Sequence, residues 1–497
     1  MKIAKSRATS VSVGATLGVL AIVAMASCSD KGDTTRTRPL TTGGESGRGG
    51  DTAFGAAAGG GSAGIAGDAG DLASLGGDGG APAVGMDATR NILATHLELD
   101  VLTHLARATI ELEGSLTSTA ATFEVGDLDV KRVTNETGPL AFALRDGKRG
   151  ALLDVEVPPS EDTATLSVDY AFRDHTMFDG WSPSRQVSFL WPYHCGNLFP
   201  CQSDPAEGVA FTMAVTGYTE GLTAVFPSSI PADAPSYMPA LAVGNYTELD
   251  LGATTKGTRI RAWHFADIGG AAELGTRHLA QVFDFYEQTY GDYAFGDTVG
   301  SVSVDWGTSG FRGMEHHPYW HINKQAFADE VVHAHEAAHG WYGNGVRIAC
   351  WEDLVLSEGI ASYLAARALQ PLGVDAWPDY ECRLMRVCDP AARINTIAMT
   401  YTCGQIDIAS HPLGSAVPYM KGAFFLRAVA EAIGPERLDE ALGAFYRAHV
   451  GDAVRMQALI DFIKSQTDAA GGTAIDELEQ SWLKQIACPL QITRQCP

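Results

Sequence analysis

The chain of 497 residues has room for two or three domains, and its hydrophobic content of 45% is that of an ordinary globular protein. Its formal net charge of -24 argues against nucleic acids and anionic lipid surfaces as electrostatic partners, because both repel a strongly acidic protein. No polybasic segment offsets this charge.

Residues 1–28 have the pattern of an export signal. Basic residues precede a weakly apolar run from Val11 to Ala26, which is too short and too polar for a membrane span. The run ends in Met-Ala-Ser-Cys, which resembles a bacterial lipobox with Cys28 as the lipidated residue. We therefore expect an exported lipoprotein, anchored through Cys28 to a bacterial membrane on its periplasmic or cell-surface side. Ordinary secretion after cleavage nearby is the alternative.

Residues 29–90 are rich in Gly, Ala, Ser and Asp, as in the stretch from Gly55 to Gly64. Such a segment has too few apolar side chains to offset the entropy that ordering would cost. We expect a disordered tether between the lipid and the folded part of the protein.

Residues 91–270 are predicted to form a β-rich domain. Leu97–Val101, Ala108–Gly114 and Leu166–Tyr170 alternate between apolar and polar residues. Side chains of a strand point to opposite faces in turn, so this alternation is typical of strands with one buried face.

Residues 271–497 are predicted to be mainly helical, with one further strand expected around Val302 and Val304, after the first helix. The apolar spacing predicts helices over the following ranges: Leu274–Tyr290, Trp351–Leu364, Pro435–Val450 and Val454–Thr467.

The stretch from Glu330 to Asn344 contains the pattern His-Glu-x-x-His. In a helix, His335 and His339 lie a little more than one turn of about 3.6 residues apart, so both imidazoles leave the same face and can share one metal ion. Glu336, beside the first histidine, can reach the open side of that metal as a general base. The alternative is a buried helix that carries histidines by chance.

Glu358 is the candidate third ligand. A carboxylate on a helix is more often a solvated charge, but Leu356, Ile360 and Ala361 give this one an apolar setting. A carboxylate is expected there only if it is paired or bound to a metal.

Four motifs in order now resemble the zinc aminopeptidases grouped with aminopeptidase N and leukotriene hydrolase. His335-Glu-Ala-Ala-His339 is followed, after 18 intervening residues, by Glu358. Gly313-Met314-Glu315-His316 resembles the family's G-x-M-E-N element, and Tyr419 to Ala423 resembles its Y-x-K-G-A element.

The resemblance implies a multidomain α+β fold, in which an N-terminal β-saddle domain precedes a thermolysin-like zinc metallopeptidase domain. Phe199–Pro205 resembles the F-P-C-x-D-E-P element of the first domain, and Trp482–Pro489 resembles the element that closes the second. We expect a variant that lacks the large C-terminal helical domain of many relatives.

The resemblance also implies a role for each site residue. His335, His339 and Glu358 would hold one zinc ion, leaving a fourth position for water, with Glu336 as general base. Tyr419 would donate its hydroxyl to the oxyanion of the tetrahedral intermediate.

Gly313, Met314 and Glu315 would bind the substrate, with Glu315 holding its free amino terminus. Met314 to Ile322 contains Pro318 and is expected to be an edge strand, which can pair with an extended peptide.

Two departures from the family pattern concern the substrate. His316 replaces the usual Asn, and we expect it, His317 and His321 to be exposed strand residues with structural or incidental roles. The alignment also places Trp191 or a neighbour where the family has a Gln or Glu that helps to hold the amine.

The cysteines are consistent with an exported protein. Besides Cys28 the chain has eight, an even number that predicts disulfides in an oxidising compartment. Short spacings favour the pairs Cys195–Cys201, Cys382–Cys388 and Cys488–Cys496, leaving Cys350–Cys403. A thiolate metal site is the competing interpretation, but no C-x-x-C spacing favours it.

The sequence thus predicts a monomeric zinc-dependent metallopeptidase with peptide substrates and no nucleic-acid partner, most simply an aminopeptidase. One alternative is a catalytically silent peptide-binding protein on the same fold, motivated by His316 and Trp191. An endopeptidase or an epoxide-type hydrolase is the other, resting on fold analogy alone.

Overall fold

The computed structural model describes residues 90–308, 311–388, 402–411, 413–485, 487–490 and 494–496. All of them lie within one compact unit, residues 76–497, so the predicted domain boundary at residue 270 stays a prediction. The predicted signal with Cys28 and the predicted tether up to residue 89 lie outside the described residues. No helix in the described ranges combines the length and the apolar composition that crossing a membrane requires.

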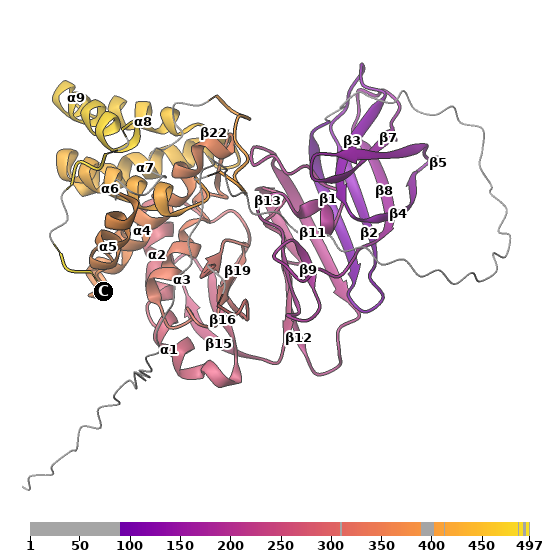
Figure 1. Ribbon diagram of the computed structural model, residues 1–497, viewed down its shortest axis with the longest axis horizontal. Coiled ribbons are helices and arrows are strands. Elements are labelled where there is room, and N and C mark those ends of the chain that lie inside the picture. Colours follow the sequence, from indigo (N-terminus) through magenta and orange to yellow (C-terminus); the bar gives the residue numbers. More distant parts are fainter. Residues whose placement is uncertain are drawn as a thin grey trace, which may run out of the picture. The chain divides into compact units, whose positions relative to one another are not determined.

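Residues 92–244 are almost entirely strands and loops, as the alternating sequence pattern predicts (Figure 1). The strands are β1 (Ile92–Asp100), β2 (Leu105–Leu112), β3 (Ala120–Gly126), β4 (Asp129–Asn135), β5 (Gly138–Pro139), β6 (Phe142–Gly147), β7 (Gly150–Glu156), β8 (Ala164–Ala171), β9 (Gly180–Ser182), β10 (Val187–Phe189), β11 (Val209–Thr216), β12 (Thr223–Val225), β13 (Ser229–Ala234) and β14 (Ala242–Gly244).

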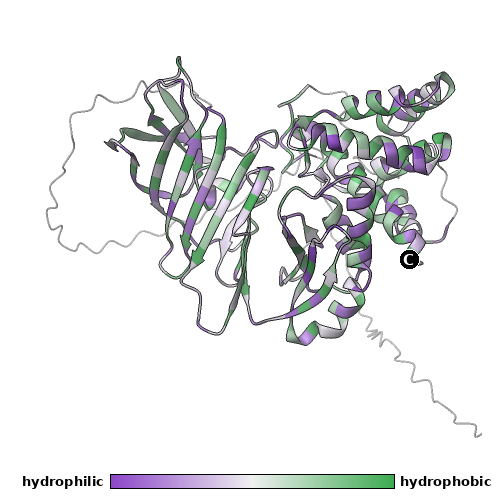
Figure 2. Ribbon diagram, turned by 180° about the vertical axis from the view of Figure 1, so that it is seen from behind, coloured by the Kyte–Doolittle hydropathy of each residue, from purple (hydrophilic) through white to green (hydrophobic). Residues whose placement is uncertain are grey.

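These strands form three sheets. The largest has the order β13-β11-β1-β2-β8-β4-β5, and the smaller ones are β3-β7-β6 and β12-β14-β10-β9. The three segments predicted from alternation fall in β1, β2 and β8, which are neighbours in the large sheet. Hydrophilic and hydrophobic residues alternate along these strands (Figure 2), so one face packs into the core and the other meets solvent.

A five-stranded sheet supports the site, in the order β15-β16-β17-β19-β18. Its strands are β15 (Tyr246–Ala253), β16 (Arg259–Phe265), β17 (Thr298–Val304), β18 (Gly313–Met314) and β19 (Tyr319–Asn323). The strand expected around Val302 is therefore confirmed as β17. The single edge strand expected from Met314 to Ile322 is wrong, because β18 forms the edge and the chain turns through Pro318 into β19.

Helices account for most of the remaining described chain (Figure 1). They are α1 (Gly269–Thr276), α2 (Leu279–Thr289), α3 (Glu330–Ala338), α4 (Ile360–Leu369), α5 (Trp377–Val387), α6 (Ala416–Ile433), α7 (Pro435–His449), α8 (Met456–Ser465) and α9 (Ala469–Leu478). A small sheet joins β20 (Tyr342–Gly343), β21 (Val346–Ile348) and β22 (Ala453–Val454).

The predicted helices need local corrections. The range 274–290 is divided between α1 and α2. The range 351–364 begins with a 3-10 turn (Trp351–Asp353) and a π-helical turn (Val355–Gly359) before α4 starts at Ile360. The helices predicted after residue 434 correspond to α7 and α8, although Val454 pairs in β22 instead of starting a helix.

The prediction that His316, His317 and His321 are exposed is wrong, because none is more than 2% exposed. The His316 ring lies edge-on to that of His321, with the centroids 4.9 Å apart, and near Phe189. Burial lowers the pKa of His316 well below its usual value and that of His321 to about 3, so both rings are neutral. The structural role predicted for them fits this position inside an aromatic cluster.

Two of the predicted disulfides are confirmed, Cys195–Cys201 and Cys350–Cys403. The other two pairings are wrong, since the structure joins Cys382 to Cys496 and Cys388 to Cys488. Cys382 and Cys388 are six residues apart on α5 and its cap. A helix separates such residues by about 9 Å along its axis, whereas disulfide Cα atoms are about 4.4–6.8 Å apart.

The corrected pairing predicts which thiol Cys382→Ser releases. Cys496 should become reactive to iodoacetamide while Cys388 stays protected, as peptide mapping without reduction can measure; reactive Cys388 would contradict the pairing. Because this disulfide closes a long loop of 114 residues, its loss should lower the free energy of unfolding by about 2–5 kcal/mol.

Candidate metal and catalytic site

Helix α3 positions the two histidines and the glutamate of the His-Glu-x-x-His pattern. Asp329 caps its start by accepting a hydrogen bond from the Val331 amide at 3.0 Å. His339 stands at the end of the helix but keeps helical backbone angles, so it shares the face of His335. The helix is almost wholly buried, and this burial fixes the direction of both imidazoles.

Glu358 reaches the same place through a contact between glycines. It lies in the turn Val355–Gly359, which packs against α6. A Cβ atom on Gly359 would lie only 2.7 Å from the Cα atom of Gly422. The two backbones can meet this closely only because both residues lack side chains. The contact brings Glu358 and Tyr419, which is one turn before Gly422, to one site.

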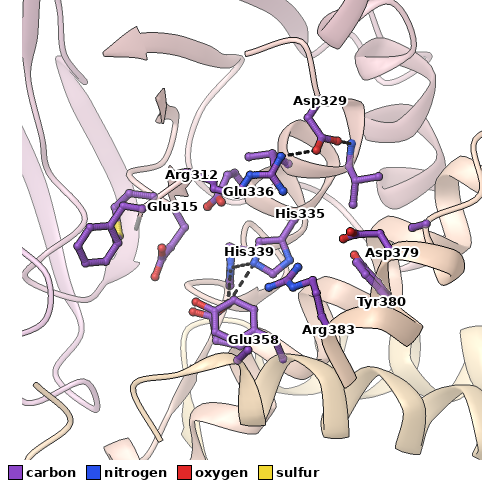
Figure 3. Close-up of a pocket in the computed structure, with 18 of the residues that line it drawn as sticks. Arg312, Glu315, Asp329, His335, Glu336, His339, Glu358, Asp379, Tyr380 and Arg383 are labelled. Carbon is purple, nitrogen blue, oxygen red and sulfur yellow. Dashed lines mark hydrogen bonds and ion pairs between the residues drawn. The ribbon is translucent and has the colours of Figure 1, made fainter. Parts of the chain in front are cut away.

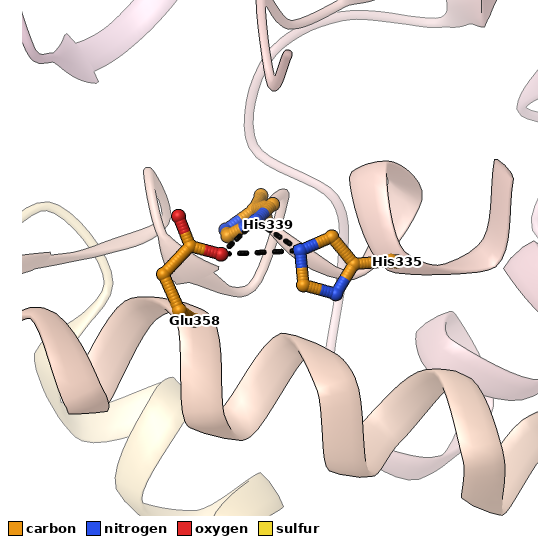
Figure 4. A group of neighbouring side chains, drawn as sticks. All are labelled: His335, His339 and Glu358. Atoms are coloured by element: carbon orange, nitrogen blue, oxygen red, sulfur yellow. Dashed lines mark hydrogen bonds and ion pairs between the residues drawn. The ribbon is translucent and has the colours of Figure 1, made fainter. Parts of the chain in front are cut away.

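His335, His339 and Glu358 converge on one point (Figure 4). The Nε2 atoms of the two histidines are 3.2 Å apart, and they lie 3.1 Å and 3.4 Å from Glu358 Oε2. Ligands of a tetrahedral zinc ion at about 2.0–2.1 Å are themselves about 3.3 Å apart. The donor atoms therefore have the spacing of three zinc ligands.

The outer nitrogens of both imidazoles are engaged elsewhere. Nδ1 of His339 lies 3.1 Å from the carbonyl oxygen of Tyr342, and because a carbonyl only accepts, Nδ1 carries the hydrogen. Ser357 Oγ lies near the same nitrogen, and Ser362 Oγ lies 3.4 Å from His335 Nδ1. With Nδ1 held in this way, Nε2 is the nitrogen of His339 that would bind a metal, once it has lost its proton.

Three buried carboxylates surround the histidines. Glu315, Glu336 and Glu358 are 4%, 5% and 5% exposed. Burial raises the pKa of Glu336 well above its usual value and also raises that of Glu315. Burial opposes the charged form of His339, but the facing carboxylates outweigh it and raise its pKa to about 10. The negative potential of these carboxylates would stabilise a cation bound between them.

Glu358 remains ionised in this setting. Burial alone would favour its neutral form, but the imidazoles of His339 and His335 outweigh burial and lower its pKa. An ionised carboxylate is the form that binds a metal ion.

The residues predicted from sequence line one cavity of about 670 Å³ (Figure 3). The lining includes Gly313, Met314, Glu315, His335, Glu336, His339, Glu358 and Tyr419. Trp191 lines it too, so an aromatic side chain stands in the wall of the cavity that Glu315 also lines. His316, by contrast, points out of the cavity into the aromatic cluster.

Gly313 makes room for the candidate base. A Cβ atom at this position would lie 2.6 Å from the Cδ atom of Glu336 and would displace the carboxylate. The glycine of the Gly-Met-Glu motif is therefore required by contact with α3.

The structure adds residues that the sequence did not single out as functional. Asn344 Nδ2 donates a hydrogen bond of 2.8 Å to the backbone oxygen of Glu315, and the hydroxyl of Tyr237 lies between Asn344 and the Glu315 side chain. Tyr380 and Arg383 come to the cavity from α5. In the sequence, only their spacing of one helical turn indicates that they share a face of α5. That this face lines the cavity follows from the tertiary structure alone.

Comparisons with known proteins show what this chain is similar to. Residues 317–482 match a family model described as "Peptidase family M1 domain". Aminopeptidase M1-B of Oryza sativa subsp. japonica is 23% identical over 357 residues, 64% of this chain and 39% of that protein. The leukotriene A-4 hydrolase homolog of Botryotinia fuckeliana is 24% identical over 412 residues, 73% of this chain and 62% of that protein. The chain thus spans less than two thirds of these relatives.

Solved structures share the fold. An M1 zinc metallopeptidase from Deinococcus radiodurans has a TM-score of 0.67 at 18% identity and covers 81% of this chain and 97% of that one. Leukotriene A4 hydrolase from Saccharomyces cerevisiae has a TM-score of 0.66 at 19% identity, covering 81% and 69%. The predicted family resemblance and fold class are confirmed.

A substitution at Gly343 would show how closely the chain packs around His339. Its φ of +112° favours glycine, and a Cβ atom there would lie 2.7 Å from His339 Nδ1. We expect Gly343→Ala to weaken zinc binding about 10–100-fold, measured by competition with a chelator. Gly373→Ala is the matched control, because its φ is +83° with nothing within 4 Å. Equal zinc affinities in the two variants would contradict this packing.

Proposed function

We propose that this chain, in which residues 317–482 match the peptidase family M1 domain, is a zinc-dependent aminopeptidase. The observation that carries the proposal is the cavity in which three donor atoms at tetrahedral spacing face Glu336, Glu315 and Tyr419. Structural metal sites are closed by four protein ligands, whereas a catalytic site keeps one position open. In the described residues this cluster offers three ligands.

Zinc bound by His335, His339 and Glu358 would polarise the scissile carbonyl and activate a water molecule. Glu336 would accept the proton of the attacking water and pass it to the leaving amine. Burial raises the pKa of Glu336 above its usual value, which favours its holding the proton between the two steps.

Tyr419 would stabilise the oxyanion. Burial raises the pKa of its hydroxyl well above the usual value, so the group remains a hydrogen-bond donor. Its ring stacks on that of His335 with the centroids 5.6 Å apart, which fixes the hydroxyl beside the metal ligands.

Glu315 supports removal of the first residue of a peptide. Its buried carboxylate lies beside His339 and Glu336 and can bind the free amine of a substrate whose first peptide bond lies at the metal. The names of the relatives support this choice, and one M1 zinc metallopeptidase has been solved with a Tyr-Ser-Ala substrate.

Trp191 motivates the second candidates, since the polar partner expected for the amine is absent at that place. Weaker binding of the substrate amine would favour an endopeptidase. A protein that binds peptides at this site without cleaving them would be a peptide-binding protein. We further propose that the protein is a monomer with one zinc ion. The lipobox-like sequence supports export and attachment to a bacterial membrane by a lipid on Cys28.

Free and N-acetylated peptides distinguish these candidates. The zinc-loaded protein should remove N-terminal residues one at a time from free peptides only, as mass spectrometry of the products can show. Glu336→Gln should keep its zinc and lose most of this turnover. Internal cleavage of both peptide sets would favour an endopeptidase, and no cleavage would favour a binding protein.

Tyr419→Phe should lower kcat about a hundredfold with little change in KM, because the lost hydrogen bond is made only in the transition state. Tyr380→Phe is the matched control: this tyrosine lines the same cavity, but its hydroxyl donates to the carbonyl oxygen of Ser362. An effect of Tyr419→Phe confined to KM would remove the oxyanion role.

A further inference from the structure

Two arginines line the cavity, and among the described residues only one of them has an anionic partner. Arg312 forms an ion pair with Asp329. Arg383 is half-buried on α5, and within the described part of the chain its guanidinium makes neither an ion pair nor a hydrogen bond. Its neighbours are the rings of Tyr380 and Tyr419, whose centroids each lie 5.9 Å from Cζ.

The acidic residues near Arg383 do not compensate its charge. Asp375 accepts a hydrogen bond from the Trp377 amide at the start of α5. Asp379, one turn before Arg383, is exposed and lies beyond the 4.0 Å limit of an ion pair. Glu381 is already paired with Arg427 and Arg494. A half-buried guanidinium without an anion is costly, so an anionic ligand would lower its free energy.

The place of Arg383 indicates which part of a peptide it meets. Figure 3 shows Glu315 on one side of the histidine pair and Arg383 on the other, reaching toward His335. A peptide with its amine at Glu315 would therefore extend toward Arg383 beyond the bond at the metal ligands.

The distances limit the length of that extension. The Tyr419 ring lies 5.6 Å from the His335 ring and 5.9 Å from Arg383 Cζ. One residue of an extended peptide advances about 3.3–3.6 Å. One or two residues after the cleaved bond are enough to bring a carboxylate from the metal ligands to Arg383.

We propose that Arg383 binds the α-carboxylate of the substrate one or two residues beyond the cleaved bond, so that the site selects dipeptides and tripeptides. This inference rests on the proposed function. A planar guanidinium can form two parallel hydrogen bonds with a carboxylate, which a neutral carboxamide cannot reproduce. The cavity would then read both charged ends of a short peptide, the amine at Glu315 and the carboxylate at Arg383.

The test compares Leu-Gly and Leu-Gly-Gly with their C-terminal carboxamides, using the full zinc-loaded chain. Native protein should have a kcat/KM on the order of tenfold higher for the free acids. Arg383→Met should bring this acid-to-amide ratio to about one, and Arg383→Lys should keep part of it. Arg386→Met, which changes an exposed arginine of the same helix outside the cavity, should keep the native ratio. The ratio is taken within one preparation, so partial misfolding does not affect it.

Each other outcome is informative. Equal rates for acids and amides in the native protein would overturn the role of Arg383 and leave the peptidase in place. Rapid cleavage of Leu-Asp-NH2 that Arg383→Met abolishes, without an acid-to-amide preference for Leu-Gly, would assign Arg383 to an acidic side chain and overturn the terminal assignment. Failure to cleave any of these peptides would overturn the proposed function and this inference with it.

Discussion

The site depends on the burial of three carboxylates that the fold brings together. Glu315, Glu336 and Glu358 lie around two imidazoles in a place with little access to water. Carboxylates in such a setting are stable only when they are protonated or face a positive charge. The raised pKa values of Glu315 and Glu336 and of His339 are the response of the protein alone. A divalent cation at the three donor atoms would answer the same need.

Small residues make this convergence possible. The contact between Gly359 and Gly422 lets the turn that carries Glu358 approach α6, and Gly313 leaves space for the Glu336 carboxylate. Each of these glycines lies within three residues of a candidate functional residue in the sequence. Their role is steric, since a methyl group at any of these positions would meet a neighbour closer than ordinary packing allows.

The cavity wall differs from the family pattern in a coordinated way. Trp191 presents an aromatic surface in the wall of the cavity that Glu315 also lines. His316 does not line the cavity and packs with His321 and Phe189. Arg383, which has no anionic partner among the described residues, adds a charge on the other side of the histidines. All three residues lie outside the cluster of His335, His339 and Glu358, so in the proposed function they would affect the peptide and not the metal ion.

The sequence by itself determined what depends on short spacing. Alternation predicted β1, β2 and β8, and the spacing of His335 and His339 predicted their common face on α3, because neighbouring residues alone set these periods. The apolar neighbours of Glu358 made it the candidate third ligand, and the resemblance to the family motif implied the same role. The tertiary structure decided the partners of Cys382 and Cys388, the burial of His316 and the direction of Arg383 into the cavity. Each of these depends on contacts between segments far apart in the chain, which local sequence patterns do not encode.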